Sequence, residues 1–232
     1  MTYSGKRHSR RPVAALAFAR CFCASGAVAQ SVASVPEGCS AVATVHKNNC
    51  VASTIVTCGD AGHQSLTYRR GKLSSTNSYD ADWSFTKWET RGAGAMEFSA
   101  VPGTGAAMSV AALKETGTHE GTGDFVINSK VIRNQGYTLT GSTIATGETV
   151  TVSGEEFAVY HADRAFARKG ATQVLTFAVD IYLSQSRDLV IEGTGARGVN
   201  DMPMQSFDMT PRAVYGPGDP GVLQTMSEFG CG

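Results

Sequence analysis

The sequence predicts an all-β, mainly antiparallel domain: a curved sheet or an unclosed β-barrel with one short helix, stapled by disulfide bonds. Runs of alternating apolar and polar residues recur along the chain, and this is the period of a half-buried strand. Glycine is frequent (26 residues) and proline is sparse (7), as suits antiparallel hairpins. An even number of cysteines follows a predicted leader, which indicates disulfide bonds.

The leader is predicted to be a signal peptide covering residues 1–29. A basic head within residues 6–11 precedes an apolar run over 13–22, and small residues end in an Ala-x-Ala cleavage pattern at Ala29. A buried N-terminal helix is the alternative, which the arginine cluster disfavours. No other segment reaches the ~18 continuous apolar residues of a membrane helix, so no transmembrane segment is predicted in the mature chain. We expect a periplasmic or secreted protein.

The mature chain, residues 30–232, is predicted to be a single β-rich domain, since no linker or repeat divides it. The whole chain has 20 basic and 20 acidic residues. The leader removes five basic and no acidic residues, which leaves 15 against 20 and a net charge of −5. An acidic chain without a basic stripe disfavours a nucleic-acid partner.

Four cysteines remain after cleavage: Cys39, Cys50, Cys58 and Cys231. In an oxidising compartment they predict two disulfides with three conceivable pairings. A zinc site would need tighter pairs, so no metal is predicted. The runs "AVATVH" and "VASTIVT" flank the turn "KNN", and a hairpin centred on Asn48–Asn49 places position 39 opposite position 58. This favours Cys39–Cys58 and leaves Cys50–Cys231.

Further strand patterns follow along the chain, in order: "DWSFTKWET" (82–90), "MEFSAV" (96–101), "GDFVINSKVI" (123–132) and "QGYTLTG" (135–141). The segment "ETVTVSGEEFAVYH" predicts two short strands around the turn Ser153–Gly154. In "VLTFAVDIYL" (174–183), apolar residues occupy every second position, which predicts a half-buried strand. With "LVIEGTG" it forms one long predicted hairpin over 173–195.

One segment has helical rather than strand periodicity. Apolar residues at helical spacing over 105–116 predict a helix of about two to three turns, with Ser109 or Thr104 as its N-cap and Gly117 at its end. The tail after Thr210 is rich in proline and glycine, so an irregular C-terminal arm is expected from about residue 211.

No catalytic residue and no cofactor are predicted, because serine-hydrolase, metalloprotease and phosphate-loop patterns are absent from the sequence. The weak polar candidates are His119 and Glu120 in "THEGTGD" and His161 and Asp163 in "YHADR". Solvated residues at strand ends or in loops explain such pairs more simply than acid–base chemistry does.

The aromatic residues Trp83, Phe85 and Trp88 are the candidates for a ligand surface. Alternating aromatics pack in a core more often than they bind a ligand, and that remains the simpler interpretation.

The segments "EGC…VHKNNC…C", "LKETGTHEGTGDF", "TGETVTVSGEEF" and "GPGDPG…C" resemble an uncharacterised group of secreted bacterial four-cysteine, β-rich proteins. This resemblance spans about Gly38 to Cys231 and implies a shared β domain with the same cysteine framework, but no activity. The long hairpins and "IYLSQSRDLVIEG" also look like parts of periplasmic lipoprotein-carrier folds. That likeness implies an unclosed barrel in which the helix at 105–116 plugs an apolar cavity.

Two functions are compatible with these features. The favoured one is a non-enzymatic binding or carrier module for an apolar, lipid-like small molecule, based on the one-sided strand at 174–183 and the single helix. The alternative is an envelope structural or interaction module that docks an envelope protein through exposed sheet edges and the tail. An enzyme ranks third.

Overall fold

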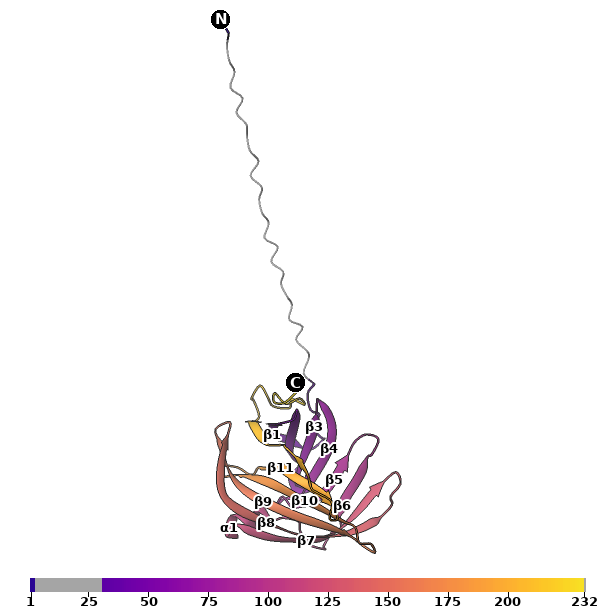
Figure 1. The fold of residues 1–232 in the computed structure, drawn as a ribbon. Coiled ribbons are helices and arrows are strands. Elements are labelled where there is room, and N and C mark those ends of the chain that lie inside the picture. The colour runs from indigo at the N-terminus through magenta and orange to yellow at the C-terminus, as the bar shows by residue number, and fades with distance from the viewer. Residues whose placement is uncertain (3–30, 232) are drawn as a thin grey trace.

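The chain folds into one antiparallel sheet that curls into a half-barrel (Figure 1). The computed structural model describes residues 1–2 and 31–231, so the predicted signal peptide and its cleavage site lie outside the described residues, Met1 and Thr2 excepted. The predicted fold class is confirmed. The 13 strands of the described residues are β1 (Ser40–Lys47), β2 (Val51–Thr57), β3 (His63–Arg69), β4 (Lys72–Tyr79), β5 (Phe85–Thr90), β6 (Met96–Ala100), β7 (Thr118–Ser129), β8 (Gln135–Val152), β9 (Glu155–Arg168), β10 (Val174–Ser184), β11 (Val190–Val199), β12 (Gln205–Phe207) and β13 (Pro211–Tyr215).

Strands β1 to β12 form an up-and-down meander in which each strand pairs with its neighbours in sequence. The last strand, β13, instead pairs with β1, so the two edges of the sheet are β12 and β13. Only residues 208–210 separate these two strands in the chain. The sheet therefore curls until its edges lie beside each other.

Polar side chains bind the connecting segment 208–210 to the turn between β1 and β2 and to β11. The Asn48 side-chain amide donates to Asp208 Oδ2 at 2.8 Å, and the Thr194 and Thr210 hydroxyls lie 2.8 Å apart. Hydrogen bonds from the hydroxyl and backbone N–H of Thr210 lower the pKa of Asp208 to about 2. The seam of the half-barrel is thus held by side chains of the connecting segment.

The first hairpin and both disulfides are confirmed. The pairs near the turn, such as Lys47 with Val51, are shifted by one residue from the predicted centre, and an irregularity between Ala41 and Ala43 restores the predicted register. Strands β1 and β2 pair with Ser40 opposite Thr57, and Cys39 is bonded to Cys58 just beyond that pair. A second bond joins Cys50 to Cys231 and ties the end of the chain to the turn of this hairpin. Two such bonds indicate an oxidising, extracytoplasmic environment.

Strands β8 and β9 are much longer than the short strands that the sequence predicts. The predicted turn is present, with left-handed backbone at Ser153 (φ 52°) and Gly154 (φ 80°). However, β8 continues through the polar residues 145–149, where the register shifts, and it incorporates the predicted strand at 135–141. The alternation of apolar and polar residues stops at this irregularity, so the sequence pattern of the single strand β8 looks like that of two separate strands.

The helix α1 (Val110–Thr116) is shorter than predicted. The Ser109 hydroxyl accepts a hydrogen bond from the Ala112 N–H, and Gly117 ends the helix with φ 75°, so both predicted caps are confirmed. The prediction of an irregular arm from about residue 211 is wrong for its first part, because residues 211–215 form strand β13. The remainder of the arm is irregular. None of the described helices is long and apolar enough to cross a membrane.

The concave side of the sheet has two halves. In the packed half, side chains from β1, β2 and β8–β11 meet Met108, Val110 and Leu113 of the helix region. The large side chains of Phe157, Ile181 and others there are fully buried. The helix covers this half as a plug would. A separate small cluster around Val56 and Leu66 lies beneath the N-terminal and C-terminal segments.

Candidate functional site

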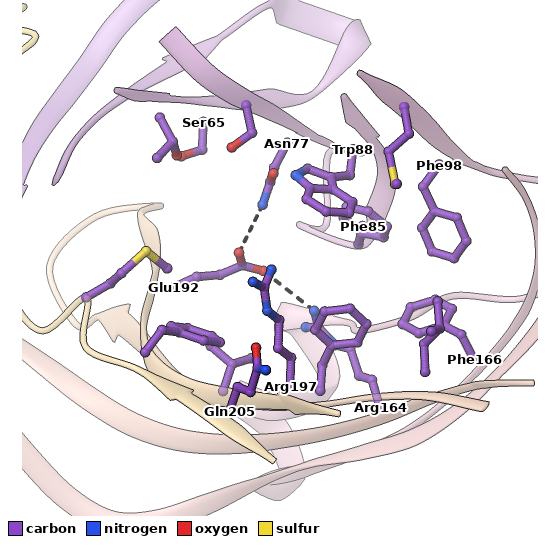
Figure 2. Close-up of a pocket in the computed structure, with 18 of the residues that line it drawn as sticks. Ser65, Asn77, Phe85, Trp88, Phe98, Arg164, Phe166, Glu192, Arg197 and Gln205 are labelled. Atoms are coloured by element: carbon purple, nitrogen blue, oxygen red, sulfur yellow. Dashed lines mark hydrogen bonds and ion pairs between the residues drawn. The ribbon is translucent and has the colours of Figure 1, made fainter. Parts of the chain in front are cut away.

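The other half of the concave side, the cavity half, contains a cavity of about 510 Å³ (Figure 2). This volume is in the range of ordinary small-molecule sites, about 300–1,000 Å³. Its walls come from β1, β3–β7 and β9–β12, so nearly the whole sheet contributes. No residue of α1 lines it, and the helix therefore plugs the packed half rather than the cavity.

One wall of the cavity is aromatic. It consists of Phe85, Trp88, Phe98, Phe166 and Phe177. Phe98 and Phe166 meet edge to face with ring centroids 4.7 Å apart, and Phe166 meets Phe177 at 5.8 Å. Such pairs hold one another's orientation, so the wall is a preformed apolar surface.

A bulge in β5 places two predicted aromatic residues on this wall. Strict alternation would put Phe85 and Trp88 on opposite faces, since they are three residues apart. The register of β4 and β5 shifts so that Tyr79 faces Phe85 while Asn77 faces Trp88. The extra residue, Thr86, lets both aromatic side chains point into the cavity.

Trp83, the third aromatic candidate, does not line the cavity. It lies in the turn before β5, with left-handed backbone (φ 59°), instead of in the strand where the alternation predicts it. Its side chain is 1% exposed, stacks on His63 at 4.0 Å and donates to Asp188 at 2.9 Å. Trp83 is a core residue of the packed half.

A polar wall adjoins the aromatic one and centres on Glu192 of β11 (Figure 2). The Asn77 amide donates to Glu192 Oε2 at 2.9 Å, and Arg164 Nη1 lies 3.5 Å from Oε1. Lys47 Nζ donates to the backbone oxygen of Glu192 at 2.6 Å. Three strands distant in sequence, β1, β4 and β9, thus contact one residue of β11.

Lys47 is a buried cation, 4% exposed. Burial lowers its pKa to about 8; the nearby Glu192 charge counteracts part of this effect, and Arg69 adds to it. Tyr79 lies close by and accepts a hydrogen bond from Asn77 at 3.2 Å. Burial raises the pKa of Tyr79 well above its usual value, so it stays a neutral phenol.

A second bulge brings Glu192 and Arg197 to the same wall. Along β10 and β11 the register shifts between Val179 and Ile181, which leaves two residues of β11 opposite one of β10. Without this shift, positions 192 and 197 would face opposite sides.

The weak polar candidates lie elsewhere: His119 and Glu120 are at the start of β7, as expected, whereas His161 and Asp163 lie within β9. His161 and Asp163 are exposed on β9, with His161 Nδ1 3.0 Å from Asp180 and Nε2 3.7 Å from Asp163. Glu120 shares a separate depression with Asp163, while His119 is not part of it. No group of His, Cys, Asp and Glu in the part of the chain that the structure describes is placed to hold a metal.

Sequence reasoning missed most of the polar wall, namely Lys47, Asn77, Glu192 and Arg197, and noticed Arg164 only as the last residue of "YHADR". None of these residues belongs to a sequence motif that marks a site. The one detectable hint is Glu192, an acid inside the apolar segment "LVIEGTG". Comparisons with protein-family models, with curated proteins and with solved structures each found no match.

Proposed function

We propose that this protein is a non-enzymatic binding or carrier module that holds an apolar, lipid-like small molecule in its cavity. The observation that carries the proposal is the aromatic wall: the partly exposed Phe85, Trp88 and Phe177, backed by the buried Phe98 and Phe166, line a cavity of about 510 Å³. Apolar surface of this kind contributes binding free energy in proportion to the area it removes from water.

The construction of the sheet supports the same function. Disulfides hold the hairpin β1–β2 and the chain end, and side chains hold the seam, so the concave surface is preorganised. Preorganisation lowers the entropic cost of binding. An interaction module would be better served by long free edges, whereas the edge strands here span three and five residues.

The neutral fluorescent probe N-phenyl-1-naphthylamine tests the proposal by titration into the mature, oxidised protein. We expect saturable binding with enhanced emission, and Trp88→Ala should weaken it about 5- to 10-fold because an aromatic contact is lost. Lys87→Ala is the matched control, since Lys87 neighbours Trp88 on β5 but pairs with Glu97 outside the cavity. Absence of saturable binding, or equal losses in both variants, would reject the proposal.

A further inference from the structure

The charges that line the cavity do not balance. Lys47, Arg69, Arg164 and Arg197 are lining cations, and Glu192 is the single lining acid among the residues that the structure describes. Glu192 accepts a hydrogen bond from Lys47 through its backbone oxygen, whereas its carboxylate pairs with Arg164 and accepts a hydrogen bond from Asn77. Arg69 and Arg197 are exposed, and neither has an ion-pair partner in the described part of the chain.

Arg164 has unused hydrogen-bonding capacity at the centre of this wall. Its side chain is only 10% exposed, and Nη1 pairs with Glu192 at 3.5 Å, a long distance for a charged pair. Its Nε is buried without a hydrogen-bond partner. A guanidinium is always charged and presents five donors, so a buried one with an orphaned donor favours an added anion.

The two ends of the half-barrel carry opposite charge. In an antiparallel meander, every second connection lies at the same end of the sheet. The connections at the cavity end are 48–50, 70–71, 91–95, 130–134, 169–173 and 200–204, with the basic residues Arg70, Arg91, Lys130, Arg133 and Lys169 and the acid Asp201. Asp208 also lies at this end, since it accepts from Asn48, and Lys169 pairs with Asp124 at 2.7 Å, so the basic excess rests on Arg70, Arg91, Lys130 and Arg133. The connections at the helix end are 58–62, 80–84, 101–117, 153–154 and 185–189, with the basic residues Lys114 and Arg187 and the acids Asp60, Asp80, Asp82, Glu115 and Asp188.

The cavity lies next to the basic end. Several of its lining positions fall at the strand ends nearest those connections, for example Arg69 at the end of β3 and Met96 at the start of β6, while Phe85 and Glu192 lie near the opposite ends of their strands. A basic rim on a protein whose mature chain is predicted to be acidic steers anions toward this opening. The positive excess at the rim and the positive excess inside the cavity both favour an anionic ligand.

We propose that the cavity binds an amphiphile with one anionic head group, carboxylate or phosphate. Arg164 and Arg197 hold the head, and the aromatic wall of Phe85, Trp88 and Phe98 holds the apolar tail. This inference rests on the proposed function and adds the ligand's charge to it. Arg164 and Arg197, on β9 and β11, lie across the cavity from Phe85, Trp88 and Phe98, on β5 and β6, so a molecule with two unlike ends can reach both groups (Figure 2).

The test compares ligands that share a twelve-carbon tail and differ in their heads. Dodecanoate, dodecyl phosphate, dodecanol and dodecylammonium each compete with N-phenyl-1-naphthylamine, below their micelle concentrations. We expect at least one of the two anions to displace the probe at about 10-fold lower concentration than dodecanol, because charged hydrogen bonds form at the head. Dodecylammonium should bind most weakly, and the two anions together distinguish a carboxylate from a phosphate site.

Two variants assign the head group to its site. Arg164→Gln and Arg197→Gln should each bring the tighter anion close to the affinity of dodecanol, within about 3-fold, while dodecanol itself binds unchanged. Arg197 is exposed, so its variant should fold normally even if loss of the Arg164–Glu192 pair perturbs the other. Arg212→Gln, an exposed arginine outside the cavity lining, is the control and should leave every affinity unaltered.

The outcomes separate the two proposals. If the probe binds and dodecanol displaces it as well as both anions do, the anionic-head inference is wrong and the proposed apolar function stands. If the anions bind tightly and neither cavity arginine matters, the head lies elsewhere and the inference is again wrong. Failure of the probe and of all four ligands to bind would instead overturn the proposed function.

Discussion

The packed half and the cavity half of the concave surface share strands β1 and β9–β11, yet one is a closed core and the other borders a cavity. On β10, Ile181 (1% exposed) and Leu183 (3%) are buried in the packed half, whereas Leu175 and Phe177 line the cavity. All four have the same parity and the same apolar character. The difference lies in what covers them, since the helix region and Trp83 fill one half.

This comparison shows that an apolar strand face specifies burial or a binding surface only together with its covering layer. The packed half follows the rule that interiors are filled to high density. The cavity half keeps Trp88, Leu175 and Phe177 partly exposed and combines them with the polar residues Asn77, Arg164 and Glu192. Substitutions in the packed half are therefore expected to lower the free energy of unfolding more than substitutions in the cavity half.

The largest expected effect comes from a matched pair of leucines on β10. Leu183→Ala should lower the free energy of unfolding by about 3 kcal/mol, because it opens a void in a closed core. Leu175→Ala removes the same atoms next to an existing cavity and should cost about 1 kcal/mol. Urea denaturation with both disulfides intact measures both. Equal losses would contradict the division of the concave side into two halves.

The second expected effect concerns the bulge that turns Arg197 into the cavity. A Cβ on Gly195 would collide with the Ala178 carbonyl oxygen and lie 2.8 Å from Phe207 Cζ. Gly195→Ala should therefore destabilise the protein by about 2 kcal/mol, because close-packed backbone must shift. Gly94→Ala is the control, since no atom lies within 4 Å of its Cβ position. A neutral Gly195 variant would mean that the bulge is not under steric constraint.

The smallest expected effect is a pH dependence from Lys47. Its folded-state pKa of about 8 lies below the ordinary value of 10.5, so the unfolded chain binds more protons between these values. Stability should then rise with pH, by about 1–2 kcal/mol between pH 8 and 9.5. Lys47→Met should abolish this slope. An unchanged slope in the variant would assign the titration to another group.

Much of the fold was predictable from local pattern. The register of β1 and β2, and with it Cys39–Cys58, follows from one turn and two β-rich runs. The caps of α1 follow from residue types with specific backbone and hydrogen-bonding preferences, Ser109 and Gly117. Such features depend on neighbours within a few residues, and the chain itself supplies those neighbours.

The candidate site was predictable only in part. Phe85 and Trp88 were identified as aromatic candidates, but strict alternation would have placed them on opposite faces of β5. Trp83 was misplaced because the Asp80 carboxylate accepts hydrogen bonds from Asp82 and Ser84 N–H and holds a turn where alternation predicts a strand. The charged residues of the polar wall have no local pattern that distinguishes them from surface residues.

The amino-acid sequence by itself determined that strands would form, where the main turns fall and which cysteines pair, since these follow from side-chain period, turn chemistry and hairpin geometry. Only the tertiary structure decided which apolar face is packed and which borders a cavity, and that Lys47, Arg164 and Glu192 meet there. The physical reason is that curvature, bulges and the covering helix act over the whole sheet. A one-residue shift in register reverses the face that a side chain occupies, and no short stretch of sequence encodes that shift alone.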